Sequence, residues 1–80
     1  MKYFTYVIYS ESHNKYYKGM TEDIEKRLKE HNSGQTSSTK FYKPWKLIYF
    51  EEFSNRDDAR KKEKFLKSGQ GRDFIKQIKK

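Results

Sequence analysis

The 80-residue sequence contains no cysteine and a single proline, and only 32% of its residues are hydrophobic. Without cysteine there can be no disulfide, no cysteine-ligated zinc site and no thiol catalysis. No apolar run approaches the roughly 18 residues that a membrane-spanning helix needs. The first ten residues, "MKYFTYVIYS", are too few and too polar for a secretory signal peptide. These absences favour a cytoplasmic protein with no membrane partner.

Aromatic and basic residues are abundant instead. Aromatic residues make up 18% of the chain, which predicts one small domain over residues 1–80 with a core built largely from Tyr and Phe. The net charge is +8, and residues 56–80 hold ten of the 19 basic residues but four of the 11 acidic ones. A basic excess of this kind indicates a polyanionic partner, most often nucleic acid. A well-solvated basic surface is the alternative interpretation.

The N-terminal segment predicts a β-hairpin. Residues 3–10, "YFTYVIYS", and 15–20, "KYYKGM", are rich in β-branched and aromatic residues, and the polar "ESHN" between them is typical of a turn. If the loop is those four residues, Ile8 lies opposite Tyr17. Because strand side chains alternate between faces, one face then carries a defined set of residues: Phe4, Tyr6, Ile8, Tyr17 and Gly19.

The rest of the chain predicts helices and one more strand. Thr21 is a candidate N-cap for a helix that runs to about Asn32 and stops at Gly34. Residues 45–53, "WKLIYFEEF", predict a third strand. A second helix is expected from Ser54 to Gly69 and a short third one from residue 72 to 80. This order predicts an α+β domain around a three-stranded sheet.

Three polar residues occupy helix positions that face a core. Arg27 and His31 fall on the stripe of the first helix that also holds Leu28, and Glu63 falls between Ala59 and Leu66 on the second helix. A buried charge without a partner costs several kcal/mol or more, so such residues are either paired or functional. Long side chains can also reach water from the edge of a stripe, and His31 could cap the last helical turn.

These residues also form a pattern that resembles the GIY-YIG nuclease superfamily, in particular its small stand-alone bacterial members. The matching fragments are "TYV", "YKGMT", "KRLKEHNSG" and "ARKKEKFLK", in order from about Phe4 to Leu66. Two departures are visible. Thr5 and Val7 flank the first tyrosine where the motif has glycine and isoleucine, and Lys18 stands where isoleucine is usual. The fragments supply the family's motif positions as Tyr6, Tyr17, Gly19, Arg27, His31, Asn32 and Glu63.

The resemblance implies an antiparallel sheet flanked by helices and an endonuclease that hydrolyses phosphodiester bonds in DNA. It implies that Tyr6, Tyr17, Arg27, His31 and Glu63 converge on one site, with Tyr6 as the general base. Tyr17 would orient the water or the phosphate, and His31 would assist Tyr6 or the leaving oxygen. Glu63 would hold one divalent ion, Mg²⁺ or Mn²⁺, since magnesium prefers oxygen ligands. Arg27 offers donors suited to phosphate, and Gly19 would leave room beside the site.

A basic segment is expected to hold nucleic acid through its phosphates rather than its base sequence. Nicked, branched, flapped or single-stranded DNA, or RNA, all remain candidate substrates. Two other hypotheses compete with the nuclease: an inactive nucleic-acid-binding module on the same fold, and a generic basic protein whose partner is another protein. The predicted phosphate-binding residues are Lys61, Lys62, Lys64, Lys67, Arg72 and Lys76, followed by Lys79 and Lys80.

Overall fold

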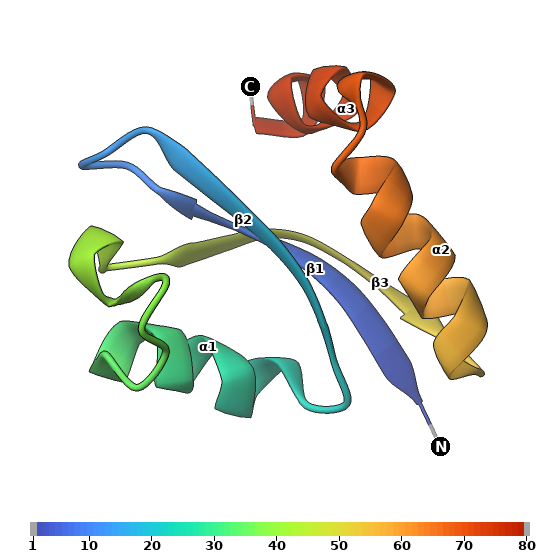
Figure 1. The fold of residues 1–80 in the computed structure, drawn as a ribbon, viewed down its shortest axis with the longest axis horizontal. Helices are drawn as coiled ribbons and strands as arrows, with labels where there is room; N and C mark the ends of the chain where they lie inside the picture. Colours follow the sequence, from blue (N-terminus) through green and yellow to red (C-terminus); the bar gives the residue numbers. More distant parts are fainter. Residues whose placement is uncertain (1, 80) are drawn as a thin grey trace.

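The computed structural model describes residues 2–79, with three strands and three α-helices (Figure 1). The predicted strands and helices are all present, and the loop before the third strand also contains a short 3₁₀ turn. This confirms the predicted α+β class, a three-stranded antiparallel sheet flanked by helices. In chain order the elements are β1 (Tyr3–Ser10), β2 (Lys15–Thr21), α1 (Ile24–Ser33), η1 (Lys40–Tyr42), β3 (Lys46–Phe53), α2 (Arg56–Leu66) and α3 (Gly69–Lys79).

The sheet places the first strand in its centre, in the order β2-β1-β3. Ile8 pairs with Tyr17 and Ser10 with Lys15, so the hairpin has the predicted four-residue loop and register. From Thr5 to Ser10 every residue of β1 is buried. A central strand covered on both faces needs apolar or hydrogen-bonded side chains at every position.

The two faces of the sheet are covered by different helices. On one face Tyr6, Ile8 and Trp45 form a cluster with Leu28 of α1. On the other face Val7 packs against α2 and α3 in a second cluster, and the buried Thr5 hydroxyl donates to the Ala59 carbonyl of α2 at 2.6 Å. Because successive strand residues point to opposite faces, α1 and α2 lie on opposite sides of the sheet, as Figure 1 shows.

The helix ends differ from the sequence prediction by one to three residues. Asp23, not Thr21, caps α1, accepting the Lys26 N–H at 3.1 Å. Thr21 is still the last residue of β2, and its hydroxyl accepts the Asp23 N–H at 3.1 Å. Asn55, not Ser54, caps α2. Gly34 ends α1 as predicted, with φ 85°, a left-handed conformation that glycine adopts without steric cost.

Gly71 fixes the junction between the last two helices. We expected Gly69 to end α2 and the last helix to begin at residue 72, whereas α2 ends at Leu66 and α3 begins at Gly69. A Cβ atom on Gly71 would lie 2.5 Å from the Leu66 Cα and closer still to the Phe65 carbonyl oxygen. Only glycine therefore allows α3 to start this close to the end of α2. Ser68 supports the junction, because its hydroxyl accepts the Gly71 N–H at 3.2 Å.

Candidate active site

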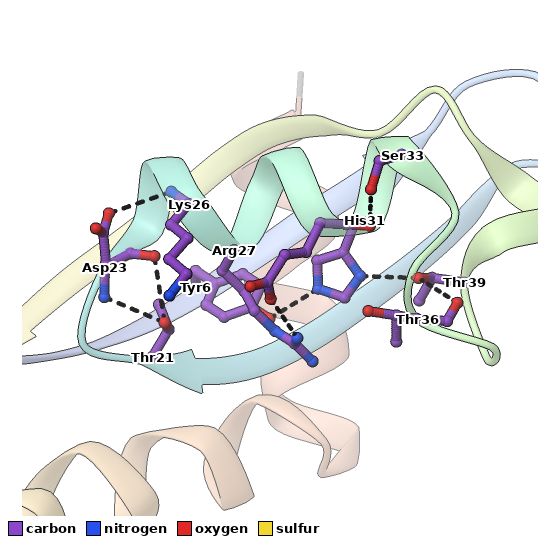
Figure 2. Close-up of polar contacts among 10 residues, drawn as sticks. Tyr6, Thr21, Asp23, Lys26, Arg27, His31, Ser33, Thr36 and Thr39 are labelled. Carbon is purple, nitrogen blue, oxygen red and sulfur yellow. Dashed lines mark hydrogen bonds and ion pairs between the residues drawn. The ribbon is translucent and has the colours of Figure 1, made fainter.

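A buried tyrosine–histidine pair lies at the centre of the α1-covered face. Tyr6 of β1 is 2% exposed and His31 in the last turn of α1 is 0% exposed. The Tyr6 hydroxyl and His31 Nε2 are 3.0 Å apart, and His31 Nδ1 lies 2.8 Å from the Thr39 hydroxyl (Figure 2). Both ring nitrogens thus have partners, which is what a fully buried imidazole requires. His31 is not a surface cap.

Two tautomers of His31 fit its hydrogen bonds to Tyr6 and Thr39. The Thr39 hydroxyl has a second acceptor in the Thr36 carbonyl, 3.4 Å away (Figure 2). In the tautomer with its proton on Nδ1, His31 donates to Thr39 and keeps Nε2 as an acceptor. Arg27 also interacts with the Tyr6 oxygen, and a guanidinium can only donate. In this tautomer the phenolic proton of Tyr6 points at His31 Nε2.

Both members of this pair are neutral near pH 7. Burial raises the pKa of Tyr6 to about 12, while Arg27 opposes the shift. Burial also lowers the pKa of His31 to about 4, and the nearby Arg27 charge adds to that shift. Desolvation disfavours the charged form of each group. The resting site therefore holds a protonated phenol beside a neutral imidazole that can accept its proton.

We predict that His31 makes stability fall between about pH 6.5 and pH 4. The unfolded chain protonates this histidine near pH 6.5, whereas the folded protein keeps it neutral down to about pH 4. Acid therefore favours unfolding in this window, by about 3 kcal/mol at its lower end. Urea unfolding at a series of pH values measures the effect. His31→Gln should reduce the dependence of the free energy of unfolding on pH above pH 5. The control His13→Gln, at an exposed histidine, should leave that dependence as it is in the parent. Equal pH dependence in the two variants would contradict the assignment to His31.

Gly19 is the reason the Tyr6 ring can lie flat across the neighbouring strand. Tyr6 pairs with Gly19 across β1 and β2. A Cβ atom built on Gly19 would be 2.6 Å from the Tyr6 hydroxyl oxygen and 2.7 Å from Cζ, distances that real Cβ atoms do not reach. Gly19 thus leaves room for the phenol.

Arg27 and Tyr17 border the pair on its accessible side. The Tyr17 ring centroid lies 4.8 Å from that of His31 and 6.3 Å from that of Tyr6. Arg27 interacts with both tyrosines and donates to the Glu30 carboxylate at 2.8 Å, and this ion pair is the main reason its pKa is raised. An open depression of about 350 Å³ reaches the arginine side chain. It is lined by Thr21, Glu22, Asp23, Lys26, Arg27 and Glu30.

Three further residues hold the site in place. The Asn32 side-chain amide makes two hydrogen bonds to the backbone of Trp45. It accepts the backbone N–H at 2.5 Å and donates to the carbonyl at 3.1 Å. The Trp45 indole N–H donates to the Thr39 carbonyl at 2.9 Å, which fixes the hydroxyl that bonds His31. Sequence reasoning assigned no role to Asn32 and missed Thr39 and Glu30. Thr39 lies in a loop of serines and threonines, and nothing in that composition marks it.

Glu63 comes from a different helix than Arg27 and His31. The sequence predicts that it shares one concave surface with the other four residues, and it lies on α2, which packs on the opposite face of the sheet from α1. Glu63 does not pair with Arg27, because its carboxylate lies 3.3 Å from Lys67 Nζ while Arg27 pairs with Glu30. Glu63 nevertheless acts on the site, since its charge contributes to the raised pKa of Tyr6. The helix stripe predicts an inward position, and the Glu63 side chain is 21% exposed, but the stripe cannot show which face of the sheet it meets.

Residues 2–76 match the family described as the GIY-YIG catalytic domain. The chain belongs to the GIY-YIG family. A similar relative is the UPF0213 protein lin0209 of Listeria innocua, 42% identical over 67 residues, which are 82% of this chain and 73% of that protein. The UPF0213 protein YazA of Bacillus subtilis is 38% identical over 81% of this chain and 66% of its own. These relatives support the expectation of a small bacterial member of the family.

A solved GIY-YIG-like fold agrees with the present one. The solution NMR structure of the UPF0213 protein BH0048 from Bacillus halodurans superimposes with a TM-score of 0.58, over 99% of this chain and 86% of that one. The sequence identity is 24%, so the likeness concerns the fold. The three-stranded sheet and its flanking helices are therefore shared with this relative.

The donor set of this GIY-YIG domain fits one magnesium-like ion bound through a single carboxylate. No group of three or more His, Cys, Asp and Glu side chains converges within residues 2–79, so a cage built from protein ligands is not present there. Magnesium is often held by one or two carboxylates plus substrate phosphates and water. Glu63 is 21% exposed in its side chain and its partner Lys67 is 57% exposed. An ion pair this accessible is weak, so the carboxylate can exchange Lys67 for a metal.

The predicted phosphate-binding residues occupy three different settings. Lys61 and Lys64 are exposed on α2. Lys62 is enclosed instead, since its ammonium lies 5.1 Å from the Phe65 ring centroid and 5.3 Å from that of Phe74 and pairs with Glu51 at 3.5 Å. Lys67, Arg72 and Lys76 lie toward β2. Lys80 and the side chain of Lys79 fall outside the described residues.

In the part of the chain covered by the structure, no helix is long and apolar enough to cross a bilayer.

Proposed function

We propose that this GIY-YIG domain is a divalent-metal-dependent endonuclease that hydrolyses phosphodiester bonds in DNA and selects DNA by structure rather than by sequence. The observation that carries the proposal is the buried Tyr6–His31 hydrogen bond with Arg27 beside it. A neutral proton acceptor, a phenol and a guanidinium in contact are suited to proton transfer next to a bound phosphate.

Phosphate binding begins at Arg27. Its planar fork of donors matches two phosphoryl oxygens, and a phosphate would take over donors that Glu30 now holds at 2.8 Å. The arriving negative charge also offsets the guanidinium that helps to lower the pKa of His31. The imidazole then becomes a better base only when substrate is bound, which restrains proton transfer in the empty site.

Tyr6 and His31 act together as the base. The Tyr6 oxygen accepts a proton from the attacking water while its own proton passes to His31 Nε2 along the 3.0 Å hydrogen bond. This relay removes the need for a free phenolate, which a pKa of about 12 makes scarce near pH 7. Tyr17 orients the water or the phosphate from the adjacent strand. A divalent ion held by Glu63 would supply charge stabilisation for the phosphoryl and leaving oxygens.

The test of this function is cleavage of a defined set of substrates. Labelled linear, nicked, branched, flapped and single-stranded DNAs, and a matched RNA, are incubated with the protein and magnesium or manganese, or with a chelator. We expect metal-dependent cleavage, with branched or nicked DNA cut faster than linear duplex. Salt-dependent binding without cleavage under either metal would instead support the inactive binding module on the same fold.

We predict that Glu63→Gln abolishes metal-dependent cleavage and leaves stability almost unchanged. Glutamine keeps the size of the side chain but loses the charge that a divalent cation requires. Its ion-pair partner within residues 2–79 is Lys67, which is largely exposed, and such a pair is worth about 0.3–0.5 kcal/mol. Arg27 pairs with Glu30 instead. Thermal melting and magnesium-dependent cleavage measure the two properties. Glu52→Gln, another acid in an exposed ion pair, is the matched control and should retain cleavage. A large drop in melting temperature for Glu63→Gln would give the residue a structural role instead.

A further inference from the structure

A second cavity lies on the far side of the sheet from Tyr6 and His31. Its volume is about 240 Å³, and it is bounded by the end of the hairpin and by α3. Four of its seven lining residues are cationic and none is acidic, while Tyr16 and Ile75 supply aromatic and apolar surface. The lining consists of Asn14, Lys15, Tyr16, Lys18, Arg72, Ile75 and Lys76.

Lys18 is the residue that makes this cavity unusual. It pairs with Val7 across the sheet, so its side chain lies on the α2 and α3 face rather than on the face of Tyr6. It stands where the family motif usually has isoleucine. Burial lowers the pKa of its ammonium, and the neighbouring charges of Arg72 and Lys67 lower it further. Placing these cations together in a half-buried setting costs stability, which an anion in the cavity would recover.

We propose that this cavity is a second phosphate subsite, which binds the backbone of the nucleic-acid strand while a neighbouring phosphate occupies the Tyr6–Arg27 site. Arg72 offers the planar fork and Lys18 the enclosed point charge that phosphate binding uses. Tyr16 and Ile75 give a sugar or base an apolar surface to lie on. The inference rests on the proposed function for the identity of the anion as part of a nucleic acid.

The position of β2 explains how one strand reaches both places. β2 is an edge strand of the sheet, and Tyr17 and Lys18 are consecutive residues whose side chains point to opposite faces. A nucleic-acid strand passing over the free edge of β2 therefore meets Tyr17 and Arg27 on one side and Lys18 and Arg72 on the other. A backbone bent around this edge would contribute to selection for nicked or branched DNA, because such DNA bends more easily than an intact duplex.

The test compares two double variants that remove the same charge. Lys18→Gln with Arg72→Gln empties the subsite of two cations, whereas Arg56→Gln with Arg60→Gln removes two from the exposed face of α2. Binding of a labelled single-stranded oligonucleotide is measured in chelator over a range of salt concentrations, so cleavage plays no part in the readout. We plot the logarithm of the association constant against the logarithm of the salt concentration. We expect the slope to be shallower in the subsite variant by about 0.7, the value for one phosphate contact on a single strand. The control should change the slope by less.

If the salt slope of oligonucleotide binding fell equally in the two variants, the subsite would be overturned, because diffuse attraction to net charge would explain both results. Competition by polyglutamate as effective as that by an unlabelled oligonucleotide would overturn its preference for phosphate. Inorganic phosphate should raise the melting temperature of the parent more than that of the subsite variant, and an equal rise in both would count against the subsite. If the double variant does not fold, Lys18→Ile, the usual motif residue, replaces it in every comparison. Loss of cleavage activity alone would bear on the proposed function and not on this site.

Discussion

Replacing Tyr6 by phenylalanine is expected to lower the rate of DNA cleavage by about 10²- to 10⁴-fold, the usual contribution of a positioned acid or base. The change removes one oxygen and keeps the ring that packs on Gly19. It deletes the hydrogen bond to His31 Nε2 and with it the route by which the attacking water loses its proton. Single-turnover cleavage with magnesium separates this effect from weaker binding, and Kd for DNA should change little.

The matched control is Tyr49→Phe. Tyr49 is a partly buried tyrosine whose pKa is raised like that of Tyr6, and its hydroxyl donates to Glu51 at 2.6 Å. It packs on the α2 and α3 face, away from the proposed chemistry, so the variant should cleave DNA at the parent rate. If both tyrosine variants lost the same amount of activity, the loss would reflect the fold, and the relay through His31 would be refuted.

Gly71→Ala is expected to destabilise the protein by about 3 kcal/mol, at the upper end of the range for overpacked sites. The added methyl group would meet the backbone of Phe65 and Leu66, which cannot move aside as a flexible side chain can. α3 must then shift away from α2, and Ile75, which is 1% exposed, must shift with it. Urea unfolding measures the loss of free energy of unfolding.

Gly69→Ala serves as the control for that variant. Gly69 also lies in α3, yet nothing is within 4 Å of the position a Cβ atom would take. Alanine there should leave stability level or raise it by up to about 1 kcal/mol, because it restricts the unfolded chain and favours the helix. A destabilisation equal to that of Gly71→Ala would show that helix propensity, and not steric contact, governs the junction.

The parts of the fold that the sequence could predict are those set by local rules. The alternation of Tyr6, Ile8 and their neighbours, together with a four-residue polar loop, is enough to fix the hairpin register. Gly34 marks the end of α1 for an equally local reason. Thr21 was a plausible N-cap by residue type, but Asp23 is the residue whose carboxylate reaches the Lys26 N–H. Composition alone does not separate two capping residues that lie two positions apart.

The parts of the site that the sequence could not predict depend on contacts between distant segments. Thr39 becomes important because Trp45 and Asn32 bring its loop against α1, and no local pattern encodes that contact. Glu30 neutralises Arg27 from the same helix, yet its spacing resembles that of any surface ion pair. For Glu63, periodicity shows that a residue faces a sheet, while the face it meets follows from the connection through β3.

The central place of β1 also determines when the chain can fold during its synthesis. This strand is made before β2 and β3, and one of its edges stays unpaired until β3, residues 46–53, has been made. Its Val7 face stays uncovered until α2 and α3 follow. The β1–β2 hairpin can therefore form early. A nascent chain that ends before residue 53, however, exposes an apolar strand whose second edge has no hydrogen-bonded partner strand. Translational pausing in that interval would favour aggregation, and brisk elongation through β3 would protect against it.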